Sequence, residues 1–113
     1  MTIDGIYAAY MTGTDGQGFG MFVFHGGVLS GADPLGVKFD GTYESSDDGK
    51  ISGTIKVTVP PEGTVVQGVS VGSSPLTYEV PLLLDADLQA MGVFRLDTPL
   101  GPVNVKLEKL RGL

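Results

Sequence analysis

The sequence predicts an all-β fold, a small antiparallel up-and-down β-barrel of about eight strands. Glycine occupies 18 of the 113 positions and separates short apolar runs at near-regular intervals. Within the clearest runs apolar and polar residues alternate, which is typical of strands with one buried face. Sequential hairpins close most simply into a barrel, because closure removes exposed strand edges. A two-sheet sandwich is the alternative.

Length and composition indicate a single globular domain without disulfides. The length indicates a single domain over residues 1–113, and 42% hydrophobic residues can form a core without cross-links. The chain contains no cysteine, so disulfides and Cys-ligated zinc are excluded. We see no secretory signal and no apolar window of membrane-spanning length, so we expect a cytoplasmic protein without a membrane partner.

The net charge of −6 bears on the partners of the protein. Nucleic acids are polyanions, and proteins that bind them usually display a basic patch. Here the seven Lys and Arg residues are scattered along the chain. We therefore expect no nucleic-acid partner, and the same charge disfavours anionic membrane surfaces.

The first half of the chain predicts five strands. Residues 5–11 and 19–25 are apolar on both faces, and Gly26-Gly27 then predicts a two-residue hairpin turn. The third strand is short, because the segment 31–34 (Gly-Ala-Asp-Pro) breaks it. Residues 37–44 and 51–59 alternate most cleanly and are joined by a turn at Asp47-Asp48-Gly49.

The second half of the chain is less regular. Residues 65–71 predict a weak strand and 76–84 a stronger one, in which Pro81 indicates an edge position or a bulge. Residues 85–90 are the stretch in which a helical turn is expected. Residues 93–98 and 103–110 form a last hairpin.

The second strand also predicts an oligomer. In a single-layer barrel, a strand that is apolar on both faces exposes one of them unless something covers it. A second copy of the chain covers it most simply, so we expect a homodimer.

Two local patterns resemble functional motifs, one catalytic and one phosphate-binding, but the residues around them do not support either function. His25 is the single histidine, and no nucleophile or second histidine stands near it, so a residue at a strand end is the simpler interpretation. The segment 16–20 (Gly-Gln-Gly-Phe-Gly) resembles a phosphate-binding loop, but such a loop needs a helix after it and a strand follows here.

Acidic pairs do not predict a metal site either. Asp47-Asp48 and Asp85-Ala86-Asp87 lack the number and spacing of oxygen ligands that calcium requires. The first pair is better explained as turn chemistry. We therefore expect no metal, no cofactor and no catalytic residue.

Bulky side chains are expected inside the barrel. The candidate interior residues are Tyr7, Phe39, Tyr43 and Ile55. Aromatic residues at alternating strand positions line ligand pockets in some barrels but more often form plain core. Their bulk, with the short strands, predicts a filled interior.

Several glycine-centred landmarks together resemble the GrlR-like family, which is related to a negative regulator of type III secretion genes. They lie mainly within residues 4–59 and comprise Asp4-Gly5-Ile6-Tyr7, Gly18-x-Gly20, Gly26-Gly27, Gly31-x-Asp33, Gly41-x-Tyr43 and a closing Val103-x-Val105-x-Leu107-x-x-Leu110.

The resemblance implies a lipocalin-like, calycin-type barrel that dimerises and regulates transcription by binding an activator protein rather than DNA. The family's regulator is associated with an unbroken acidic run on an exposed loop. The corresponding residues here are interrupted by serines, and they are Glu44, Ser45, Ser46, Asp47 and Asp48.

Three functions follow as hypotheses. The first is a non-enzymatic protein-interaction module with a regulatory role, which contacts its partner through residues 44–48. The second is a carrier of a small apolar ligand in the barrel interior, since an eight-stranded barrel holds packed side chains or one small ligand. The third is an enzyme with a carboxylate site, for which no motif is present.

Overall fold

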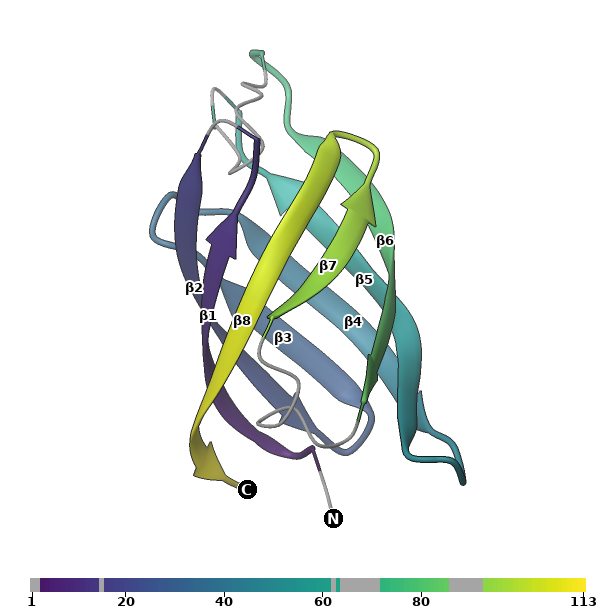
Figure 1. The fold of residues 1–113 in the computed structure, drawn as a ribbon. Coiled ribbons are helices and arrows are strands. Elements are labelled where there is room, and N and C mark those ends of the chain that lie inside the picture. The colour runs from purple at the N-terminus through teal and green to yellow at the C-terminus, as the bar shows by residue number, and fades with distance from the viewer. Residues whose placement is uncertain (1–2, 15, 62, 64–71, 86–92) are drawn as a thin grey trace.

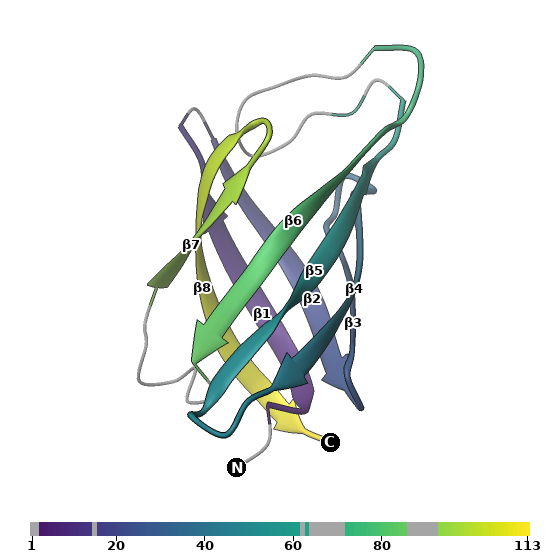
Figure 2. The ribbon, with the colours of Figure 1, turned by 90° about the vertical axis from the view of Figure 1, so that its right-hand side faces the viewer.

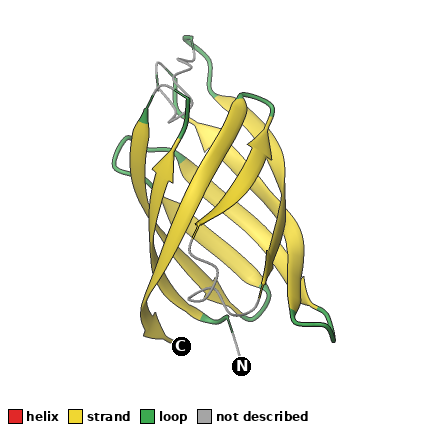
Figure 3. Ribbon diagram, in the orientation of Figure 1, coloured by secondary structure: helices red, strands yellow, loops and turns green. Residues whose placement is uncertain are grey.

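The computed structural model describes residues 3–14, 16–61, 63, 72–85 and 93–113. These residues form eight strands, and no helix occurs among them (Figure 3). The strands are β1 (Gly5–Thr12), β2 (Gln17–His25), β3 (Val28–Ala32), β4 (Lys38–Ser45), β5 (Lys50–Val59), β6 (Leu76–Asp85), β7 (Val93–Thr98) and β8 (Gly101–Gly112).

The strands form one antiparallel sheet that curls into a nearly closed barrel (Figures 1 and 2). Hydrogen-bonded neighbours follow the order β6-β5-β4-β3-β2-β1-β8-β7, so the first strand pairs with the last. Strands β6 and β7 stand at the two ends of this order. The predicted small up-and-down barrel is confirmed.

The turns follow the glycine pattern. Gly26 and Gly27, between β2 and β3, have φ values of 58° and 86°, and Gly49, between β4 and β5, has a φ of 80°. Only glycine adopts this left-handed region without strain, which is why these positions reverse the chain. Both hairpin turns expected from the sequence are therefore present.

Some boundaries differ from those expected. Strand β3 continues through Gly31 to Ala32, because Gly31 pairs with Phe22 on one side and Phe39 on the other. Asp85 is the last residue of β6 rather than the start of a helical turn. Pro81 lies in a strand at one end of the sheet order, as its missing N–H requires. The expected strand at 65–71 and residues 86–90 lie outside the described part.

Alternation along the strands separates interior from exterior. In β5 the inward residues Ile51, Ile55, Val57 and Val59 are at most 5% exposed. Several inward positions carry glycine, and each stands beside a large inward side chain. Gly31 lies between Phe22 and Phe39, whose ring centroids are 4.9 Å apart. This pairing of small with large residues fits side chains into a narrow barrel.

Candidate ligand-binding cavity

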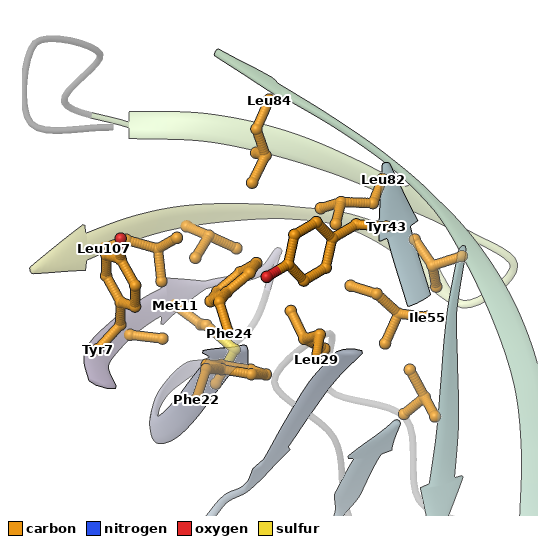
Figure 4. Close-up of a cluster of buried hydrophobic side chains, with 14 of the residues drawn as sticks. Tyr7, Met11, Phe22, Phe24, Leu29, Tyr43, Ile55, Leu82, Leu84 and Leu107 are labelled. Atoms are coloured by element: carbon orange, nitrogen blue, oxygen red, sulfur yellow. The ribbon is translucent and has the colours of Figure 1, made fainter. Parts of the chain in front are cut away.

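The interior of the barrel contains a cavity of about 260 Å³. All eight strands contribute to its wall, and Figure 4 shows side chains from opposite strands converging on the interior. Most of the lining is aliphatic or aromatic, and its core is formed by Met11, Phe22, Phe24, Leu29, Val37, Phe39, Ile55, Val57, Val80, Leu82, Leu84, Phe94, Leu96, Val103, Val105 and Leu107.

The filled interior expected from the bulky residues is therefore wrong. Two features accompany the space. Gly18 adds no side-chain volume where it lines the wall, and the rings of Phe22 and Phe39 pack against each other beside Gly31. Protein interiors are normally packed without voids much larger than a water molecule, so this cavity requires an explanation.

The four residues expected in the interior divide into two groups. Phe39 and Ile55 line the cavity, whereas Tyr7 and Tyr43 are buried at the end of the barrel that holds the chain termini. There Tyr7 and Tyr43 lie on either side of Phe24, with ring centroids 5.2 and 5.5 Å from it. This aromatic group packs at the lower end of the barrel, where Figure 1 shows both chain termini.

Hydrogen bonds hold the lower end together. The Tyr7 hydroxyl donates to the Ile3 carbonyl at 2.6 Å, and the Tyr43 hydroxyl donates to Asp4 Oδ1 at 2.8 Å. Asp4 Oδ2 accepts the Gly26 N–H at 3.3 Å and lies 3.7 Å from His25 Nδ1. Asp4 thus ties the N-terminal segment to β4 and to the β2–β3 turn.

The same contacts shift the titration of both tyrosines. Burial, and then the hydrogen bond to Asp4, raise the pKa of Tyr43 to about 12. Burial, followed by the charge of Asp4, also raises the pKa of Tyr7. Both phenols are therefore protonated and donate hydrogen bonds at neutral pH.

The upper end of the cavity carries its polar lining. Asp33, Tyr78 and Thr98 are its polar residues at inward positions, whereas Gln17 reaches the wall from the outward-facing side of β2. Asp33 Oδ1 accepts the N–H groups of Leu35 and Val37 at 2.9 and 3.0 Å, which orders the β3–β4 connection. Sequence reasoning missed this rim, although Asp33-Pro34 is a recognisable turn signal.

The remaining sequence candidates lie away from the cavity. His25 is an exposed residue at the end of β2, and its side chain is 69% accessible. The glycine-rich segment enters β2 directly, without the helix that phosphate binding needs. Within the described ranges no three His, Asp or Glu side chains could together hold a metal ion; Asp87 lies outside them.

Residues 44–48 form the exposed hairpin connection between β4 and β5. Glu44 and Ser45 end β4, and Asp48 Oδ1 accepts hydrogen bonds from the Ser46 hydroxyl and the Lys50 N–H. These bonds lower the pKa of Asp48. Asp48 therefore holds the turn, while Glu44 and Asp47 are exposed acidic groups.

The outer face of β1, β2 and β3 carries an apolar stripe. Its members are between 37% and 51% exposed, and they are Tyr10, Phe19, Met21, Val23 and Val28. The strand register places Tyr10 opposite Phe19, with ring centroids 5.5 Å apart. The stripe is the structural counterpart of the two-faced apolar pattern in the sequence.

Comparisons with protein-family models, curated proteins and solved structures find no match to this chain. The resemblance to the GrlR-like family therefore stays a prediction. Among the described residues, none belongs to a helix long and apolar enough to cross a membrane.

Proposed function

We propose that this protein is a non-enzymatic carrier of a small apolar ligand, which it encloses in the barrel. The cavity of about 260 Å³ with an aliphatic and aromatic wall carries the proposal. An apolar cavity of about 150 Å³ is already large enough to take up benzene. Binding sites for small molecules are typically apolar concavities with a few polar groups, which is the arrangement at the upper rim.

The size of the cavity limits its ligand. About ten non-hydrogen atoms fit a space of this order, and ligands of that size reach micromolar affinity when they are well enclosed. The driving force is the removal of ligand and wall surface from water, about 25 cal/mol per Å² of apolar area.

Filling the cavity tests the proposal. We expect 1-octanol to raise the melting temperature of the wild-type protein, because a ligand that binds the folded state stabilises it by about 2.7 kcal/mol at 100 times its Kd. Val105 lines the cavity, so Val105→Phe should occupy the space and weaken octanol binding by at least about tenfold.

The control is Val93→Phe, which makes the same change at a position that is 58% exposed. It should leave octanol binding unchanged. Equal octanol binding by the two variants, or no effect of octanol or any other apolar compound of this size on the wild-type protein, would contradict the carrier function.

A protein-interaction module with a regulatory role is the second candidate function. The apolar stripe on β1, β2 and β3 supports it, because exposed apolar patches on soluble proteins commonly mark contact surfaces. In this function the stripe joins two copies, and Glu44 and Asp47 on the β4–β5 turn face a partner protein. In this function the protein acts in the cytoplasm.

A further inference from the structure

We infer that the ligand of the cavity is uncharged, and that the cavity discriminates against small carboxylates of the same chain length. The inference rests on the proposed carrier function and specifies its ligand class. Two observations support it. The cationic side chains lie away from the cavity, and an aspartate stands in its lining.

No cationic side chain lines the cavity. All seven Lys and Arg residues and the single His lie within the described part of the chain, so their positions are known. Six of the seven, and the histidine, are exposed: His25, Lys38, Lys50, Lys56, Arg95, Lys106 and Arg111. Lys109 is half-buried, but its Nζ lies 6.0 Å from the centre of the Tyr7 ring, at the end opposite the polar rim.

Among the described lining residues, the charged one is acidic. Asp33 is half-buried at the rim, and its Oδ1 is held in place by the two N–H groups of Leu35 and Val37. A carboxylate ligand enclosed by the cavity would lose its hydration, find no cation in the lining and stand near a like charge. Each of these effects disfavours the ionised form of the ligand.

A neutral polar group meets a better environment at the same rim. Tyr78 and Thr98 stand at inward positions of β6 and β7, and their hydroxyl groups give this rim neutral polar character without charge. A cationic head would meet Asp33, whose Oδ1 already accepts two N–H bonds, but an ammonium group loses its hydration on entering a wall that is otherwise mostly apolar. An uncharged ligand with at most one small polar group therefore fits the cavity best.

Three compounds with the same eight-carbon chain test this inference. We expect calorimetry on the wild-type protein at neutral pH to show 1-octanol binding at least about tenfold more tightly than octanoate, with octylamine no tighter than octanol. Octanoate binding as tightly as octanol would overturn the inference and leave the carrier function standing. Octylamine binding more tightly would overturn it in favour of a cationic ligand. If none of the three binds, the carrier function itself fails.

A pair of isosteric variants locates the discrimination. Asp33→Asn keeps an oxygen that can accept the Leu35 and Val37 N–H groups but removes the charge. We expect it to reduce the octanol-to-octanoate preference several-fold, because octanoate no longer stands near a like charge. Asp40→Asn, at an exposed position of β4, is the matched control and should not alter the preference. The same preference in both variants would overturn the role assigned to Asp33.

Discussion

Single glycines decide how closely strands β4 and β5 approach. A Cβ atom built on Gly53 would overlap the carbonyl oxygen of Thr42 and come within 2.8 Å of the Tyr43 Cα, and one built on Gly41 would overlap the Thr54 carbonyl. Both obstacles are backbone atoms, which cannot move aside as a flexible side chain does. Glycine is therefore required at these two inward positions by space, independently of φ.

We predict that Gly53→Ala destabilises the protein by about 1–3 kcal/mol, because the backbone of β4 must shift to accommodate the methyl group. Urea unfolding measures the change in the free energy of unfolding. Gly72→Ala is the control, since a Cβ atom added there would have nothing within 4 Å, and it should stay within about 0.5 kcal/mol of wild type. Equal effects of the two variants would refute the packing argument.

The burial of Tyr43 and its hydrogen bond to Asp4 make the stability of the folded protein depend on pH in the alkaline range. The pKa of Tyr43 is raised to about 12 from 10.0, so the folded state holds the phenolic proton more tightly than the unfolded state. A raised pKa contributes stability that is complete below pH 10 and is lost as the pH rises toward 12. Burial and the hydrogen bond to Asp4 are the two largest causes.

We predict that the wild-type protein loses stability between pH 10 and 12, and that Tyr43→Phe flattens this dependence. The variant is also less stable at neutral pH, because Asp4 loses a hydrogen-bond donor, so the slope with pH is the measurement that matters. Denaturant titrations across this range provide it. Tyr10→Phe, on the outer face, is the control; a Tyr43→Phe slope equal to that of wild type would contradict the assignment.

At the scale of the element, β2 serves two surfaces at once. Its inward residues Phe22 and Phe24 are buried in the interior, while its outward residues Phe19, Met21 and Val23 form the centre of the apolar stripe. Because successive strand residues point to opposite faces, a strand that is apolar throughout contributes to both. The inward residues are apolar because they form the core. The outward residues are apolar although they are exposed, so the core does not account for them.

We predict that the stripe joins two copies of the chain and that Val23→Glu converts the dimer to a monomer. A charge buried at the centre of a contact loses its hydration without gaining a partner. Native mass spectrometry and sedimentation give the subunit number. Thr54→Glu, at an exposed position of β5, is the control and should leave the dimer intact. A monomeric wild-type protein would contradict the prediction.

In the molecule as a whole, an aromatic cluster at the lower end of the barrel lies beside an interior cavity. The aromatic group around Phe24 and the hydrogen bonds of Asp4 tie together segments that are far apart in sequence. The cavity lies above them, and its wall is distributed over all eight strands. A ligand there contacts the whole sheet, so its binding should stabilise the fold globally rather than a single hairpin.

Much of the fold was predictable because its signals are local. The alternation in β4 and β5 identified the inward residues of both strands, and Gly26-Gly27 and Gly49 identified two turns. The candidate site was less predictable. Phe39 and Ile55 were expected in the interior and line the cavity, but the rim at Asp33 was missed, since a turn signal does not indicate what the turn borders.

Alternation and turn chemistry act between neighbouring residues, so the all-β class, the succession of hairpins and the inward faces of β4 and β5 could be read from the sequence. The interior cavity, and the packing of Tyr7 and Tyr43 around Phe24 at one end of the barrel, became visible in the three-dimensional structure alone. Interior space depends on the summed volumes of side chains that meet across the barrel from all eight strands. The volume left between them is set by the closure of the sheet and by how those side chains pack against one another.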